Sequence, residues 1–140
     1  MKNENHSSIS PVPRYAVGVL LRDGKILMGK RVKNRKQYPN AWSFFGGRCE
    51  GNETYYETLV RELQEELGIE VLQASSLHFF DQSPAILFEV FAVTQWQGEP
   101  MNKATEEHEV IQWFLLEEAK QLPVAAATYE IIFEKLMNHK

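Results

Sequence analysis

The order of apolar and polar positions along the chain predicts several strands and a few helices. Two apolar stretches separated by the turn dipeptide Asp23-Gly24 predict a β-hairpin over residues 14–31. A polar loop over 32–40 leads to a short aromatic strand over 41–45, which runs into Gly46-Gly47. Further strands are predicted over 69–80, 85–96 and 109–114, and helices over 54–67, 116–122 and 128–138. Strands that precede and separate a few helices favour an α+β fold or a mixed α/β sandwich.

The helix over 54–67 has clear sequence boundaries. Thr54 and Glu57 have the spacing of an N-terminal capping box, and Gly68 stands where a left-handed C-terminal cap is expected. Five side chains fall within one apolar stripe: Tyr56, Leu59, Val60, Leu63 and Leu67. The pattern therefore predicts a helix that docks on the core through this stripe.

Three glutamates lie beside the stripe, because Glu62, Glu65 and Glu66 are spaced i, i+3 and i+4. Like charges at these spacings repel each other by roughly 0.2–0.5 kcal/mol per pair. They also lie in the last two turns, where the helix dipole disfavours anions by about 0.3–1 kcal/mol each. A solvated acidic face and a cation-binding site are both open interpretations, and the unfavourable placement of the charges supports the second.

A hard divalent cation accounts for this group of carboxylates. Mg²⁺ prefers oxygen ligands, and such an ion polarises phosphoryl oxygens and lowers the pKa of an attacking water. A backbone carbonyl at Gly46-Gly47 can provide another oxygen. The Arg61 guanidinium can hold Glu53 through two hydrogen bonds, which would tie the preceding loop to the helix; an ordinary surface ion pair is the alternative.

Composition narrows the class of protein. The 140 residues fit one domain, with 44% hydrophobic and 24% charged residues. The formal net charge is −4, and the sequence has no basic stripe of the kind that binds a nucleic-acid polymer. The basic segment 30–36 is either a solvated loop or a rim that attracts phosphate. No apolar run approaches the ~20 residues that span a bilayer, so no membrane partner is expected.

The remaining features bear on location and domain organisation. The single cysteine, Cys49, excludes an intrachain disulfide and fits a reducing cytoplasm, which is the expected location. Residues 1–12 are polar, lack the apolar stretch of a signal peptide, and are expected to be a flexible lead-in. Residues 13–140 are expected to form a single domain.

The residues around the acidic helix resemble the Nudix family. Gly47, five residues, Glu53, seven residues, and then Arg-Glu-Leu-Gln-Glu-Glu-Leu-Gly-Ile over 61–69 match the Nudix box at every fixed position. The N-terminal hairpin, Trp42 ahead of the two glycines, and the acidic run 107–109 leading into Trp113 are similar to small MutT-like members. So many fixed positions at fixed spacing make the resemblance specific.

The resemblance implies a Nudix-type α/β/α sandwich around a mixed sheet. It also implies hydrolysis of a nucleoside diphosphate linked to another group, by water attack on phosphorus with Mg²⁺ or Mn²⁺. By position, four groups would be metal ligands: Glu62, Glu65, Glu66 and the carbonyl of Gly46. Glu62 would also be a candidate to orient or deprotonate the water, and Glu53 with Arg61 would be the supporting pair in the catalytic set.

Two further positions bear on the resemblance. Members often recruit one more carboxylate from outside the box, and Glu107 is favoured for this role over Glu109. Many members have proline before the two glycines, and this chain has Phe45 there, which leaves the shape of the loop open.

A nucleobase needs a flat aromatic surface and a few hydrogen bonds. Candidates for contact with the substrate are Arg31, Trp42, Phe44, Phe45, Phe80 and Asp81. For each aromatic side chain, packing in the core is the alternative. Pro84 stands about where some ADP-ribose-cleaving members carry a proline.

Three hypotheses about function follow. The leading one is Mg²⁺-dependent hydrolysis of a nucleoside triphosphate or damaged nucleotide to a monophosphate and pyrophosphate. The second is hydrolysis of ADP-ribose or a sugar nucleotide. The third is a Nudix module that binds nucleotides without turnover, which the complete set of box carboxylates disfavours. The expected partner is a small-molecule nucleotide, and a homodimer is left open.

Overall fold

The computed structural model describes residues 12–77, 87–126 and 128–138. The strands are β1 (Arg14–Arg22), β2 (Lys25–Arg31), β3 (Trp42–Ser43), β4 (Phe45–Arg48), β5 (Glu70–Ser76), β6 (Leu87–Gln97) and β7 (His108–Leu115). The helices are α2 (Tyr55–Leu67), α3 (Leu116–Ala119) and α4 (Tyr129–Met137). None of these helices is long and apolar enough to cross a membrane.

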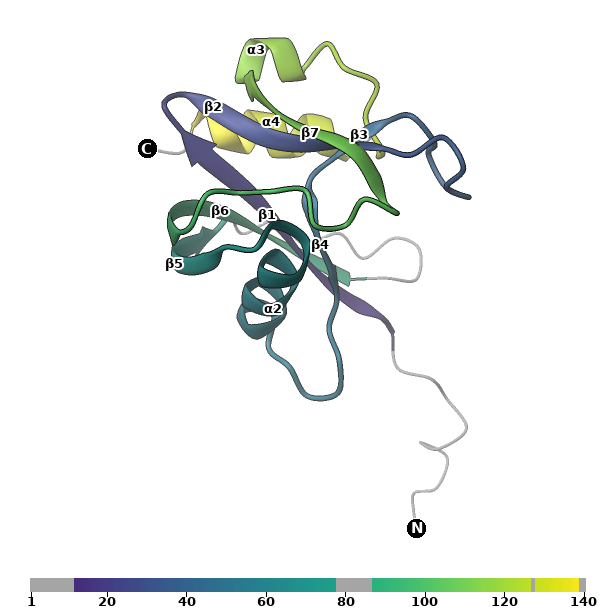
Figure 1. The fold of residues 1–140 in the computed structure, drawn as a ribbon. Coiled ribbons are helices and arrows are strands. Elements are labelled where there is room, and N and C mark those ends of the chain that lie inside the picture. The colour runs from purple at the N-terminus through teal and green to yellow at the C-terminus, as the bar shows by residue number, and fades with distance from the viewer. Residues whose placement is uncertain (1–11, 78–86, 127, 139–140) are drawn as a thin grey trace.

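Strand β1 lies at the centre of a mixed sheet. It pairs in parallel with β6 and antiparallel with β4 along its first half, and it turns into β2 at its end. Strand β5 continues the sheet beyond β6, while β3 and β7 pair with β2. Figure 1 shows α2 on one side of the strands and α3 with α4 on the other. The mixed sheet with helices on both sides confirms the predicted fold class.

Two hydrophobic clusters hold the helices to the sheet. Val19 belongs to the cluster that includes Phe133 of α4, whereas its neighbour Leu20 belongs to the cluster that includes Leu63 of α2. This division follows from the strand, because successive side chains point to opposite faces. Leu59, Leu63 and Leu67 are all fully buried, so the predicted stripe docks α2 on the sheet.

Most predicted elements are confirmed, with small shifts at their ends. The hairpin turns at Asp23-Gly24, and α2 has the capping box of Thr54 and Glu57 and a left-handed Gly68. The helix predicted over 116–122 is shorter, because α3 ends at Ala119. Tyr56 was predicted to face the core, but it is 39% exposed, and its ring makes a T-shaped contact with that of Phe91.

The strand predicted over 41–45 is wrong in its extent. It is broken at Phe44, because Trp42 and Ser43 pair with β2 whereas Phe45 to Arg48 pair with β1. Gly46 and Gly47 therefore lie within a strand and do not follow it. Gly46 lies so close to β1 that an added Cβ would overlap the carbonyl oxygen of Ala16. Glycine is required there because the two backbones approach each other so closely.

The docking of α2 predicts a large effect of core truncation. Leu63→Ala should lower the free energy of unfolding by about 2–5 kcal/mol, because it leaves a cavity beneath the helix. Leu72→Ala is the matched control, since the Leu72 side chain on β5 is 54% exposed, and its effect should stay within about 0.5 kcal/mol. Denaturant unfolding of both variants measures the difference, and equal losses would contradict this account of the packing.

Candidate active site

A bidentate ion pair joins α2 to the loop before it. Arg61 Nε donates to Glu53 Oε2 at 2.7 Å and Arg61 Nη2 donates to Glu53 Oε1 at 2.9 Å. Arg61 Nη2 also donates to the Arg48 carbonyl at 3.0 Å, and the Thr58 hydroxyl donates to Glu53 at 2.8 Å. This confirms the pairing predicted from the sequence, and its fork geometry makes it more than an ordinary surface contact.

The same contacts fix the charge state of the pair. The hydrogen bonds from Arg61, followed by the backbone N–H of Glu50, lower the pKa of Glu53 to about 2. Glu53 in turn raises the pKa of Arg61. Both groups are therefore charged across the physiological range.

Glu62 is held over the backbone of β4. Arg61 Nη1 donates to Glu62 Oε2 at 3.0 Å. A Cβ added to Gly47 would overlap the Glu62 carboxylate, so the second glycine of the pair makes room for this side chain. The Glu62 side chain is only 15% exposed, whereas that of Glu65 is 59% exposed and lies 3.5 Å from Arg61. The helix therefore separates the two glutamates into a pocket-facing and a solvent-facing group.

Glu66 is the most buried of the three helix glutamates, with 7% of the residue exposed. Burial, followed by a hydrogen bond shared with Glu62 and the nearby charge of Glu107, raises the pKa of Glu66 to about 9. A hydrogen bond from the Gly46 backbone acts in the opposite direction. A carboxyl group in this environment favours any neighbour that supplies positive charge.

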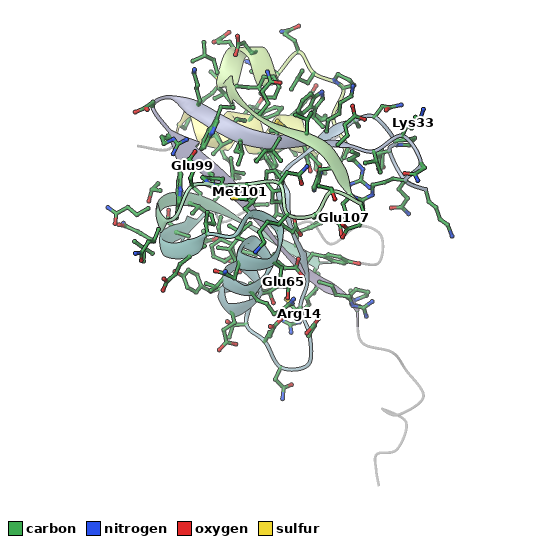
Figure 2. The ribbon with its side chains drawn as sticks, in the orientation of Figure 1. Arg14, Lys33, Glu65, Glu99, Met101 and Glu107 are labelled. Atoms are coloured by element: carbon green, nitrogen blue, oxygen red, sulfur yellow. The ribbon has the colours of Figure 1, made fainter. Side chains whose placement is uncertain are left out.

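The segment that precedes β7 brings Glu107 to this cluster. The N–H groups of Met101 and Lys103 donate to the carbonyls of Leu67 and Glu66 at 3.0 and 2.9 Å, which satisfies acceptors left free at the end of α2. Figure 2 labels Glu65 on α2 and Glu107 on this segment. Of the two predicted candidates, Glu107 lies at the cluster, whereas Glu109 lies 4.0 Å from Lys30.

His108 completes the wall behind these carboxylates. Its side chain is buried, its Nε2 lies 3.9 Å from Glu66 Oε1, and its ring meets the edge of Phe45. One ligand atom each from Glu66, Glu107 and His108 lie within 4.8 Å of one another. Burial, followed by the charges of Arg35 and Arg31, lowers the pKa of His108 to about 4, so the ring is neutral at neutral pH.

The carboxylates face a pocket of about 340 Å³. Its wall has an acidic part and an aromatic part, and the lining residues are Tyr15, Val17, Arg35, Phe44, Phe45, Gly46, Gly47, Glu62, Glu66, Glu107 and Tyr129. Carboxylate oxygens gathered around a buried Glu66 fit a hard divalent cation of the Mg²⁺ or Mn²⁺ type, because such ions prefer oxygen donors.

The predicted substrate residues have mixed placements. Phe44 and Phe45 line the pocket, but both are largely buried, and the Phe44 ring stacks on Tyr129 at 4.7 Å. Trp42 packs edge-on against Phe114 and does not line the pocket. Arg31 donates to the carbonyls of Gln37 and Tyr38, so its guanidinium binds the loop that follows β2 and does not line the pocket. Phe80, Asp81 and Pro84 lie outside the described residues.

Sequence reasoning missed three residues of the pocket, Tyr15, Val17 and Tyr129. Each was assigned only to an element, because apolar spacing identifies a strand or helix face but not a cavity beside it. From the sequence, Arg35 was noted only as part of the basic segment 30–36. In the structure, it is the residue of that segment that lines the pocket.

Comparison with known proteins assigns this chain to a class, the hydrolases of phosphoanhydride bonds. The model of the NUDIX domain matches residues 12–135. The chain therefore belongs to the Nudix family. A CTP pyrophosphohydrolase of Escherichia coli (strain K12) is 35% identical over 117 residues, which cover 81% of this chain and 84% of the relative.

Two further matches agree with this assignment. An 8-oxo-dGTP diphosphatase of Buchnera aphidicola is 26% identical, with 84% of this chain and 88% of the relative covered. The crystal structure of a MutT NUDIX hydrolase from Burkholderia pseudomallei superposes with a TM-score of 0.76 at 27% identity, and 91% of this chain and 98% of that chain are covered. The protein is thus a MutT-like Nudix hydrolase that acts on phosphoanhydride bonds.

The burial of Glu66 predicts a pH-dependent gain in stability on its neutralisation. Because the folded state raises the pKa of Glu66 from 4.5 to about 9, the folded protein binds this proton more tightly than the unfolded chain. Stability attributable to Glu66 is therefore lost as the pH rises from about 4.5 towards 9. Glu66→Gln should raise the free energy of unfolding at pH 8, without divalent metal, by about 1–3 kcal/mol.

Urea unfolding at pH 8 and pH 4.5 tests this expectation, since the gain should disappear at the lower pH. Glu65→Gln is the matched control, because this side chain is 59% exposed and should change stability by less than about 0.5 kcal/mol at either pH. A Glu66→Gln protein no more stable than wild type at pH 8 would show that the carboxyl group is not desolvated.

The Arg61 hydrogen bonds join the loop before α2 to the helix. We therefore predict that a positive charge at position 61, without the guanidinium group, is insufficient to hold the two together. Arg61→Lys keeps the charge but loses the fork that reaches Glu53, Arg48 and Glu62 together. We expect a loss of about 1–3 kcal/mol in the free energy of unfolding and a lower kcat. Arg48→Lys, at the exposed last residue of β4, is the control, and equal unfolding curves for both variants would refute this role of the Arg61 hydrogen bonds.

Proposed function

We propose that the protein is a divalent-metal-dependent pyrophosphohydrolase of nucleoside triphosphates, which releases a nucleoside monophosphate and pyrophosphate. The observation that carries the proposal is the convergence of Glu62, Glu66 and Glu107, from two distant segments, on one wall of a partly aromatic pocket. Relatives named for CTP and 8-oxo-dGTP cover most of this chain, which supports a nucleoside triphosphate, normal or damaged, as substrate.

The proposed metal ligands follow from the donor set. Glu62, Glu66 and Glu107 would hold Mg²⁺, with Mn²⁺ as an alternative, and the carbonyl of Gly46 and the more exposed Glu65 are further candidates. A bound ion of this type polarises a phosphoryl oxygen and lowers the pKa of water near it. Glu66 is the residue whose environment most favours a cation, because its carboxyl group is buried beside two others.

The protein's own side chains would orient the reactants. Glu62 is the proposed group that orients the attacking water or accepts its proton, because Arg61 fixes its carboxylate over Gly47 at the pocket. Arg61 and Glu53 act as positioning residues, since they fix the helix and the loop together. The aromatic part of the pocket, with Phe44 and Tyr129, would contact the nucleobase.

A panel assay with Mg²⁺ tests the proposal. Nucleoside triphosphates should give a monophosphate and pyrophosphate, faster than ADP-ribose or nucleotide sugars are cleaved, and chelation of divalent metal should abolish turnover. Glu62→Gln and Glu66→Gln should lower kcat by about 10²–10⁴-fold. Glu70→Gln, at an exposed position on β5, is the control that should retain wild-type turnover.

Three outcomes would refute parts of the proposal. Cleavage of no phosphoanhydride with any divalent cation would refute the activity. Preferential cleavage of ADP-ribose would refute nucleoside triphosphates as the substrate class. Full turnover in Glu62→Gln and Glu66→Gln would show that these carboxylates take no part in the mechanism.

A further inference from the structure

Arg35 is the cationic member of the described residues that line the pocket. Its Nη1 lies 3.7 Å from Glu107 Oε1, and the two side chains are 29% and 43% exposed. The other basic side chains of the 30–36 segment are placed elsewhere: Lys30 lies near Glu109, Arg31 binds loop carbonyls, and Lys33 and Lys36 are exposed. The charge that faces the pocket from this segment is therefore that of Arg35.

The position of Arg35 is fixed by the backbone and not only by its ion pair. Its N–H donates to the Val32 carbonyl at 3.2 Å, which closes a turn. The N–H of Val32 donates to the Glu107 carbonyl at 3.0 Å, so the turn is attached directly to the residue that Arg35 faces. Arg31 closes the rest of the loop through Gln37 and Tyr38. The backbone that carries Arg35 would therefore stay beside the pocket if the Glu107 side chain turned away.

The contact between Arg35 and Glu107 is an exchangeable one. At 3.7 Å and partly exposed, it is the kind of ion pair that contributes little to stability. Each partner would bind another ligand at this site more strongly. A divalent cation is a stronger partner for the Glu107 carboxylate, and the oxygens of a phosphate match the Arg35 guanidinium fork.

We propose that Arg35 binds a phosphate oxygen of the substrate's polyphosphate chain, in exchange for its contact with Glu107. This inference rests on the proposed function, and it makes Arg35 a substrate-binding residue that favours longer phosphate chains. The exchange has two consequences of opposite sign when Arg35 is removed. Polyphosphate binds more weakly, because its partner is lost, and Mg²⁺ binds at least as tightly, because Glu107 is released.

The test measures both consequences on the full chain. Calorimetric titration with inorganic tripolyphosphate at saturating Mg²⁺, and with Mg²⁺ alone, is carried out on wild type, Arg35→Ala, Arg35→Gln and Arg35→Lys. The Kd for tripolyphosphate should rise roughly tenfold to a hundredfold in the alanine and glutamine variants and less in the lysine variant. The Kd for Mg²⁺ alone should stay equal or fall.

Lys33→Ala is the matched control, since Lys33 is an exposed cation on the same loop, labelled in Figure 2. Its Kd for tripolyphosphate should change by less than about twofold. In the enzyme assay the Arg35 variants should raise KM for a nucleoside triphosphate by the same factor as Kd, with kcat changed less. A purely structural role would instead weaken Mg²⁺ and tripolyphosphate binding together.

Failure of the inference is distinct from failure of the proposed function. If wild type cleaves triphosphates but Arg35→Gln and Arg35→Ala keep Kd and KM within twofold, the inference is overturned and the function stands. Equal losses in Lys33→Ala, or joint loss of Mg²⁺ binding, also overturn it. If wild type cleaves no triphosphate, the proposed function fails, and the tripolyphosphate titration still decides whether Arg35 is a phosphate-binding residue.

Discussion

The burial of the Glu66 carboxyl group beside two other carboxylates is the constraint on which the site depends. A carboxylate in this position is unfavourable, as its raised pKa of about 9 indicates. The fold tolerates it because α2 is held by other means. Leu59, Leu63 and Leu67 dock the helix, and the caps at Thr54 and Gly68 satisfy its ends. The acidic wall is therefore maintained by parts of the helix that take no part in chemistry.

Hydrogen bonds on both sides of α2 fix the positions of the carboxylates. On its N-terminal side, the hydrogen bonds of Arg61 attach the loop that carries Glu53 and also restrain the Glu62 carboxylate. At its C-terminus, the N–H groups of Met101 and Lys103 bind the last helix carbonyls and so place the segment that ends in Glu107. Because hydrogen bonds within the protein set these positions, through side chains at Arg61 and through the main chain at Met101 and Lys103, the site is organised before any ligand arrives.

The sequence predicted those features whose causes are local. Capping residues, apolar spacing and the i, i+3, i+4 glutamates all act within one helix, and the Arg61–Glu53 pair spans about two turns of that helix. The sequence did not predict that Glu66 is buried and Glu65 exposed, because Glu107 and His108, the residues beside Glu66, come from a distant segment of the chain. It also missed Tyr15 and Tyr129, which reach the same pocket from opposite ends of the chain. Their proximity depends on the packing of α4 against the sheet, which no local pattern encodes.

The charge balance of the pocket explains why one guanidinium can matter there. Because the raised pKa of about 9 keeps Glu66 protonated at neutral pH, the charged groups among the described lining residues are the carboxylates of Glu62 and Glu107 and the Arg35 guanidinium. Their net negative charge opposes a polyphosphate unless cations accompany it. Exposed lysines on the loop act through solvent, where salt screens charges beyond ~8 Å at physiological ionic strength. Arg35 and Glu107 hold each other at 3.7 Å, and a cation or a phosphate must break the same contact to bind its own partner. Whichever binds first leaves the other partner free. Polyphosphate and divalent cation should therefore strengthen each other's binding by the same factor, because such coupling is reciprocal.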